Sequence, residues 1–302
     1  MLIGIDKNRY QVLLQEGGYQ VNATLAKELR NNGPAVGDIV SLAGDISSDE
    51  GALSRIVRIE PRTTLLRRSA DDSDQVERVI VANATQLMIV IAAANPEPRT
   101  RLVDRYLAAA YDAGLKPIIC VTKTDLADPS EFLENFQGLS IPIIRTRSDT
   151  FELSEIHKLL DGQTTVLVGH SGVGKSTLIN ALVPEADRVT GDVNEATGRG
   201  RHTSSSAIAL PLVDSEGWII DTPGIRAFGL SHIDNQRIVD AFSDLSEVAA
   251  NCLSNCSHAE SSCKLDAWAS PDGVANAHRT ARLASLRSLL AVKDSSASIV
   301  EE

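Results

Sequence analysis

The sequence predicts a multidomain fold with an N-terminal β-barrel, a central α/β domain and a C-terminal helical region. Three observations carry this prediction. Short apolar runs separated by turn signals fill the first part of the chain, and a glycine-rich loop lies between a β-type run and a helix-like run near its middle. Three cysteines and a histidine gather near its end. We expect the boundaries to fall at 1–72, 73–232 and 233–302.

The first part is predicted to be a small barrel. Alternating runs such as Leu53–Ile59 are separated by turn-forming stretches at Asn31–Pro34 and Asp49–Gly51. An OB-fold fits this size and pattern, and OB-folds commonly bind nucleic acid. From the pattern alone, an SH3-like barrel fits nearly as well. Asp71–Asp74 is predicted to be a linker.

The glycine-rich loop at residues 169–176 reads G-x-x-x-x-G-K-S. It follows the β-type run Thr164–Val168 and precedes the helix-like run Ser176–Leu182, which is the context that a phosphate loop requires. Backbone N–H groups and the helix N-terminus of such a loop attract phosphate oxygens. Lys175 is expected to reach the β- and γ-phosphates, and the Ser176 hydroxyl to bind Mg²⁺. An ordinary glycine-rich turn is the alternative, which the complete motif in this context argues against.

Two further motifs specify the nucleotide. Asp221–Gly224 reads D-T-P-G after an apolar run, so its carboxylate is expected to reach Mg²⁺ through water and the Gly224 N–H to contact the γ-phosphate. Thr122–Asp125 reads T-K-T-D after another strand-like run. A carboxylate at Asp125 accepts two hydrogen bonds from guanine that adenine cannot supply. Alone, T-K-x-D is usually a polar loop, but together the three motifs predict a guanine nucleotide.

The order of these motifs is unusual. In most GTPases the guanine motif follows the phosphate loop and D-x-x-G, whereas here Thr122–Asp125 comes first. The sequence therefore predicts a circularly permuted GTPase domain, which a compact domain tolerates because its ends lie close together on the surface. In this order D-x-x-G lies near the end of the domain, so the segment that follows it is coupled directly to the nucleotide state.

The segment that follows contains Cys252, Cys256, His258 and Cys263. Three thiols and an imidazole at this spacing predict a tetrahedral zinc site. The fourth cysteine, Cys120, lies in an apolar strand-like run. In a cytosolic chain such spacing indicates a metal rather than disulfides. A chance cluster of reduced thiols beside a surface histidine is the alternative.

The motif order, the stretch Gly198–Thr203, D-T-P-G and the Cys-Cys-His-Cys cluster together resemble the ribosome small subunit-dependent GTPase A (RsgA) family, over nearly the whole chain. This resemblance implies an OB-fold, a permuted GTPase domain and a zinc-binding helical domain. It also implies GTP hydrolysis in late maturation of the small ribosomal subunit, ribosomal RNA binding, and release after hydrolysis. A GTP-gated RNA-binding scaffold and a GTPase of large-subunit assembly are the alternatives.

The resemblance also implies roles for single residues. Ile225 occupies the position where many GTPases have a water-orienting glutamine, so His202 is implied as catalytic beside Lys175; RNA contact or local packing is the alternative for His202. Thr203 and Ser204 are open alternatives as Mg²⁺ ligands with Ser176. The implied GTP-binding residues are Thr122, Lys123, Thr124, Asp125, Ser148, Gly169, His170, Ser171, Gly172, Val173, Gly174, Lys175, Ser176, Thr177, Asp221 and Gly224.

One departure from the family pattern and one predicted mobile segment accompany these roles. Thr122 stands where many family members have asparagine, and we expect it to loosen the connection between the guanine loop and the phosphate loop. Residues 187–206 occupy the position of switch I, a segment that orders when γ-phosphate and Mg²⁺ hold it.

Composition limits the partners. The 302 residues carry a net charge of −11, which argues against non-specific nucleic-acid binding. Local basic patches remain, although each is equally well explained as solvated surface: Arg62 with Arg67 and Arg68; Arg199 with Arg201; Arg279 with Arg282 and Arg287.

The longest apolar run, Leu87–Ala94, is predicted to be a buried strand rather than a membrane span. With no secretory signal at its start, the chain is expected to be cytoplasmic, monomeric and without membrane contact, with the small ribosomal subunit, its RNA and GTP or GDP as partners.

Three long helices are predicted. Pro98–Ala113 places Leu102, Tyr106, Ala109 and Ala113 on one face, and Ile233–Ala249 forms a second helix. The third, Val274–Val292, is followed by a tail at Lys293–Glu302. Its predicted core-facing residues are Ala281, Leu283, Ala284, Leu286, Leu289 and Leu290.

Overall fold

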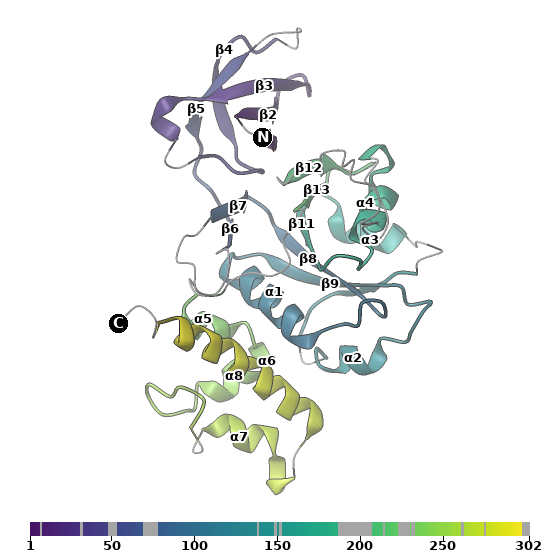
Figure 1. Ribbon diagram of the computed structural model, residues 1–302, viewed down its shortest axis with the longest axis vertical. Coiled ribbons are helices and arrows are strands. Elements are labelled where there is room, and N and C mark those ends of the chain that lie inside the picture. The colour runs from purple at the N-terminus through teal and green to yellow at the C-terminus, as the bar shows by residue number, and fades with distance from the viewer. Residues whose placement is uncertain are drawn as a thin grey trace, which may run out of the picture.

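The computed structural model describes residues 1–6, 8–30, 33–47, 53–68, 78–137, 139–147, 150, 153–186, 207–213, 215–222, 230, 233–260, 263–274 and 276–297. In this part of the chain, one sheet of eleven strands runs from the N-terminal region into the central region, and β6 and β7 form a separate pair. The C-terminal helices lie at the opposite end of the molecule from the N-terminal strands (Figure 1).

The central region is a parallel sheet with one antiparallel edge. Its strand order is β10-β9-β8-β11-β13-β12, and β12 alone among these six strands runs antiparallel to its neighbour β13. The strands are β8 (Gln86–Ala92), β9 (Lys116–Thr122), β10 (Ile143–Arg145), β11 (Thr164–Val168), β12 (Ile208–Pro211) and β13 (Trp218–Asp221). The helices between them are α1 (Thr100–Asp112), α2 (Ser130–Glu134), α3 (Leu153–Leu160) and α4 (Lys175–Leu182).

Both faces of this sheet are covered. Every residue of β8 is buried, as expected for a parallel strand with helices on both sides. Apolar residues of α3 and α4 pack on one face, and those of α1 pack on the other (Figure 1). The predicted helix at 98–113 is confirmed as α1, with Tyr106 and Ala109 fully buried and Leu102 and Ala113 partly buried.

The N-terminal strands follow the order β1-β2-β3-β5-β4, and the parallel pair is β3 with β5. The strand β1 connects the N-terminal and central regions. Leu2 packs in the core of the N-terminal strands, Ile3 packs in the central core, and Gly4 pairs with Ile208 of β12. The strands here are β1 (Leu2–Asp6), β2 (Arg9–Leu13), β3 (Gln20–Leu25), β4 (Val40–Gly44), β5 (Ser54–Ile59), β6 (Leu65–Arg68) and β7 (Arg78–Ala82).

The C-terminal helices correct three expectations. The single helix predicted at 233–249 is two helices, α5 (Asn235–Asp240) and α6 (Ser243–Ala249), because the chain leaves helical geometry at Phe242. After α7 (Lys264–Ala269), the last helix α8 (Ala277–Ala297) begins later than Val274 and continues into the predicted tail.

The buried face of α8 also differs from the prediction. Leu283, Leu286, Leu289 and Leu290 are buried as expected, but Ala281 and Ala284 are exposed. The positions beside the leucines are filled instead by Arg282 and Ser285, both of which are buried. Apolar periodicity missed them because both side chains are polar, and their partner lies on another element.

No helix in the described part of the chain is long and apolar enough to cross a membrane.

Candidate nucleotide site and metal centre

The predicted nucleotide motifs meet at one edge of the central sheet. The phosphate loop follows β11, Asp221 ends β13, and Thr122 ends β9, so all three lie at the carboxyl ends of parallel strands. Between β11 and β8 the strand connections change direction, since later strands extend one way and earlier strands the other. Open α/β sheets bind ligands at such a switch point.

Two glycines give the phosphate loop its shape. A Cβ on Gly169 would lie 2.4 Å from the Val90 carbonyl oxygen, so a side chain there would push β8 and the loop apart. Gly174 has φ of +89°, a left-handed conformation that glycine adopts without strain, and it is the residue from which α4 begins. The first helical turn therefore starts at Lys175, with its N–H groups directed toward the loop.

Lys175 contacts the D-x-x-G aspartate. Its Nζ lies 2.5 Å from Asp221 Oδ1 and 3.4 Å from the Thr222 carbonyl oxygen. The Thr222 hydroxyl donates to the Leu167 carbonyl at 2.8 Å, which holds the end of β13 against β11. The phosphate loop and D-x-x-G, which are separated in sequence, are thus joined by an ion pair at the centre of the site.

The guanine motif is tied to the phosphate loop by two side chains. The Thr122 hydroxyl lies 2.5 Å from the Val173 carbonyl oxygen and 3.1 Å from that of Ile91, so this threonine does connect the two loops. Lys123 Nζ donates to the Gly172 carbonyl at 2.8 Å and also to the Asn95 carbonyl. The Gly172 and Val173 carbonyls of the phosphate loop are therefore held by side chains of the guanine motif.

The remaining predicted residues fall into two groups. Within the described residues, Asp125 is half-buried beside Thr124, whose N–H donates to the Thr146 carbonyl at 3.1 Å; Ser176 is half-buried, and Thr177 is exposed. The residues that lie outside the described part of the chain are Ser148, His202, Thr203, Ser204 and Gly224.

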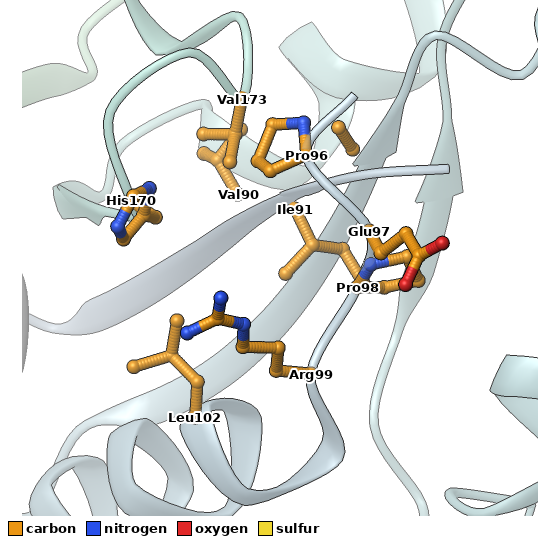
Figure 2. Close-up of a pocket in the computed structure, with 10 residues that line it drawn as sticks. Val90, Ile91, Pro96, Glu97, Pro98, Arg99, Leu102, His170 and Val173 are labelled. Atoms are coloured by element: carbon orange, nitrogen blue, oxygen red, sulfur yellow. The ribbon is translucent and has the colours of Figure 1, made fainter. Parts of the chain in front are cut away.

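A cavity of about 30 Å³ adjoins the phosphate loop, and sequence reasoning did not anticipate it. His170 and Val173 form one wall, and the other is formed by Val90–Ala92 of β8, by Pro96–Arg99 and by Leu102 of α1. Figure 2 shows the Arg99 side chain extending toward the side where His170 lies. The His170 Nδ1 lies 2.9 Å from the Ser171 carbonyl oxygen, so Nδ1 carries the proton, since a carbonyl can only accept.

The cysteine–histidine cluster is brought together as expected. Potential ligand atoms of Cys252, Cys256, His258 and Cys263 all lie within 4.8 Å of one another. The Cys252 and Cys263 Sγ atoms are 3.8 Å apart, and Cys263 Sγ is 3.7 Å from His258 Nδ1. Tetrahedral zinc with Zn–S of about 2.3 Å requires ligand atoms roughly 3.5–3.8 Å apart, which these two separations match, and the four residues together could hold a metal ion.

Other contacts hold this loop in shape. Glu260 Oε1 accepts from the Ser257 N–H at 3.0 Å. Hydrogen bonds from the backbone N–H groups of Ser257 and of Glu260 itself lower the Glu260 pKa to about 2. The remaining cysteine, Cys120, is fully buried in β9, and burial raises its pKa to about 12. Cys120 is therefore a neutral thiol of the sheet core, separate from the cluster.

The basic patches proposed from sequence are largely paired. Arg62 makes a bidentate contact with the buried Asp38 at 2.8 Å, and Arg287 makes another with Asp266. Arg282 lies inside the protein, so the expectation that it belongs to a solvent-facing RNA patch is wrong. Arg199 and Arg201 lie outside the described residues.

A guanine-type loop after β9, a phosphate loop after β11 and a D-x-x-G aspartate at the end of β13 lie at one sheet edge. This chain order defines the class of circularly permuted P-loop GTPase folds. The family model described as RsgA GTPase matches residues 59–231, which is more than half of the chain. The chain belongs to the RsgA GTPase family.

Relatives and solved structures agree with this assignment. The chain is 38% identical over 214 residues to the "Small ribosomal subunit biogenesis GTPase RsgA" of Alcanivorax borkumensis, and the match covers 68% of this chain and 60% of the relative. It is 34% identical over 265 residues to the protein of the same name from Bordetella pertussis, covering 85% of each. With the first of these, the chain aligns over less than two thirds of the relative's length.

Two crystal structures share the fold. YjeQ from Thermotoga maritima superposes with a TM-score of 0.70 at 25% identity, covering 96% of this chain and 97% of its own. YloQ, described as a circularly permuted GTPase, gives a TM-score of 0.68 at 24% identity, covering 97% and 94%.

Proposed function

We propose that this protein hydrolyses GTP and acts in maturation of the small ribosomal subunit, in the cytoplasm. The observation that carries the proposal is the Lys175–Asp221 pair at 2.5 Å, because it joins the phosphate loop to D-x-x-G beside a guanine-type loop in the permuted order of the family. The relatives are named for small ribosomal subunit biogenesis, which is why this subunit is the proposed partner.

Different residues of the chain would bind the phosphates, the metal and the base. Lys175 would neutralise charge on the β- and γ-phosphates, which requires it to leave Asp221 when nucleotide enters. That exchange releases the Asp221 carboxylate, which together with the Ser176 hydroxyl, and with Thr203 or Ser204, offers the oxygen ligands that Mg²⁺ prefers. When bound, Mg²⁺ supplies further charge neutralisation at the phosphates. Asp125 would accept from guanine.

The two flanking regions are proposed to recognise RNA. The N-terminal strand order β1-β2-β3-β5-β4 supports a partly open OB-fold, with the chain divided at 1–72, 73–232 and 233–302. The 3.8 Å and 3.7 Å separations in the cysteine–histidine cluster support one structural Zn²⁺ held by Cys252, Cys256, His258 and Cys263. Both regions would contact ribosomal RNA from a monomeric protein, and release would follow hydrolysis.

Phosphate release with and without each purified ribosomal subunit tests the proposal. We expect stimulation by the small subunit and not by the large one. Stimulation by the large subunit would move the protein to large-subunit assembly, and GTP-dependent subunit binding without hydrolysis would make it a scaffold.

His202→Ala sharpens that assay. If His202 orients the attacking water, the variant keeps GTP affinity and loses subunit-stimulated turnover, because an interaction used only in the transition state affects kcat alone. Normal turnover of this variant on the small subunit would remove His202 from the mechanism.

A further inference from the structure

A buried arginine joins the C-terminal helices to the central domain. Arg282 of α8 is 3% exposed, and its Nη1 donates to Asp104 Oδ1 of α1 at 2.6 Å. Its Nε lies 3.4 Å from Asp244 Oδ2 of α6. The Ser285 hydroxyl, one turn along α8, donates to the second oxygen of Asp104, whose side chain is fully buried. The helices α1, α6 and α8 therefore meet at the Arg282 guanidinium.

Aromatic rings complete the surroundings of this arginine. Its guanidinium carbon lies 4.1 Å from the centroid of the Phe242 ring and 5.9 Å from that of Phe136. Guanidinium is weakly hydrated and stacks on aromatic faces, so arginine tolerates this position better than lysine would. Burial raises the pKa of the Asp104 carboxyl, and the contacts with Arg282 and Ser285 oppose that rise.

Stability alone does not account for the contact. Replacing a buried ion pair with apolar residues is often neutral or stabilising, and apolar neighbours such as Leu283 and Leu286 already pack in the shared core with α1. A buried ion pair can, however, fix one alignment of α8 along α1. If α8 slid along α1 by one turn, the buried Asp104 carboxylate would lose Arg282, and an unpaired buried charge is strongly destabilising.

The helix α1 leads from this contact to the nucleotide site. Arg99, just before α1, and Leu102 in its first turn line the cavity whose other wall is His170 and Val173 of the phosphate loop. Just before it, the Asn95 carbonyl accepts from Lys123, which also holds the Gly172 carbonyl. A shift of α1 would therefore change the contacts of the phosphate loop.

The helix α8 leads from the same contact to the cysteine–histidine loop. Arg287 Nε donates to the His258 carbonyl at 2.6 Å, and its two terminal nitrogens pair with the Asp266 carboxylate at 2.9 and 2.8 Å. Figure 1 shows α8 lying between α1 and α7. One helix thus contacts both the domain that carries the phosphate loop and the loop that carries the candidate metal ligands.

We infer that Asp104 and Arg282 are positioning residues through which nucleotide exchange on the phosphate loop changes the stability of the C-terminal helical region. This inference rests on the proposed GTP binding. Such coupling is reciprocal, so anything that orders the C-terminal region on its partner also changes the affinity for GTP relative to GDP.

Hydrogen exchange of the full chain with GDP and with a non-hydrolysable GTP analogue tests this inference. In the wild type we expect exchange rates of peptides covering 252–263 and 277–291 to differ about fivefold between the two nucleotides, the lower end of usual couplings. Asp104→Asn keeps the shape of the side chain and removes its charge, and it should abolish the difference while both nucleotides still bind.

The matched control lies on the same interface. Glu134→Gln removes the carboxylate paired with His278 at 2.9 Å, where the side chains are 43% and 53% exposed, and it should keep the wild-type difference. If Asp104→Asn does not fold, Ser285→Ala removes one hydrogen bond to the same carboxylate and should reduce the difference.

Fluorescent-nucleotide titration of each protein distinguishes a failure of the proposed GTP binding from a failure of the inferred coupling. A wild type that binds neither nucleotide overturns the proposed function, and the inference with it. A wild type that binds both, with equal exchange in the two states, overturns the inference alone. So does a wild-type difference that persists in Asp104→Asn and in Ser285→Ala.

Discussion

The nucleotide edge of the sheet and the junction between α1 and α8 are both polar, but they are organised differently. At the nucleotide edge each motif is a short run that directly follows a strand, and much of its bonding is to backbone atoms, as between Thr122 and Val173. At the junction Arg282 and Asp104 are 178 residues apart, and side chains make the contact. The first arrangement can be recognised in sequence, whereas the second becomes visible only when the helices pack.

This difference predicts which property each site loses first when a side chain is replaced. Backbone groups keep their positions when one side chain changes, so variants at the nucleotide edge should lose binding while the fold survives. The C-terminal region depends on a few side chains that hold helices or a loop together, so variants there should first alter local order. Four further measurements test this contrast, beginning with the largest expected effect.

Removing the metal should have the largest effect. Four ligands in a short polar loop leave little apolar surface for folding, and zinc binding by such segments contributes on the order of 10 kcal/mol near neutral pH. Cys256→Ser should therefore lose zinc and increase hydrogen exchange across 252–263, while GDP binding weakens by no more than about fivefold, since the phosphate loop has its own contacts. Metal analysis and exchange measurements report both changes.

Ser254→Ala is the control, because Ser254 is exposed in the same loop and is not among the clustered ligands. It should keep one zinc per chain. A zinc content well below one in wild-type protein never treated with chelator would refute the site.

Lys175→Ala should have the next largest effect. The side chain is expected to contact phosphate oxygens in both ground state and transition state, so its loss should reduce affinity and turnover together. Hydrogen bonds to charged groups contribute about 3 kcal/mol at most, which corresponds to about a 100-fold weaker Kd. Nucleotide titration measures this.

Lys158→Ala serves as the comparison, since Lys158 is exposed on α3 away from the loop. It should bind nucleotide as the wild type does. If Lys175→Ala retained wild-type affinity, the lysine would be a partner of Asp221 only.

Asp125→Asn should change base preference rather than abolish binding. The carboxylate accepts two hydrogen bonds from guanine, whereas the new amide can donate to the 2-oxo group of xanthine. Losing one well-formed contact and gaining another should shift the preference toward xanthosine nucleotide by about 10- to 100-fold. Competition between GDP and XDP measures the ratio, and an unchanged preference would remove Asp125 from the base site.

Much of the fold could be predicted because its signals are local. The β-type run at Thr164–Val168 is β11, the buried strand predicted at Leu87–Ala94 is β8, and the helix predicted from the apolar period at 98–113 is α1. The strand β1 was not predicted, since Leu2 and Ile3 pack in different cores and no single alternating pattern results.

Elements that depend on distant partners were the ones missed. Phe242 interrupts the helix predicted at 233–249 and stacks on Arg282, which a single-segment pattern cannot reveal. Arg282 itself was interpreted as solvated or RNA-facing charge, because arginine is rarely buried unless paired, and its partner Asp104 lies on another helix. Of the candidate site, the motifs were predicted, but the cavity at His170 and Arg99 was not, because it depends on how α1 packs.

Thr122→Val should have the smallest effect, and it tests how far one side chain contributes to a backbone-organised site. Valine keeps the shape of threonine but lacks the hydroxyl that contacts the Val173 and Ile91 carbonyls. Losing one such hydrogen bond costs about 1 kcal/mol, so GDP should bind about fivefold more weakly. Thr85→Val removes a hydroxyl that contacts the Thr164 carbonyl at 3.3 Å, at the opposite end of the strands, and should leave binding unchanged. Thr122→Asn, the residue of many family members, should bind GDP more tightly than the wild type if threonine loosens the two loops. Equal affinity in all three Thr122 proteins would show that Lys123 and the backbone hold the phosphate loop without it.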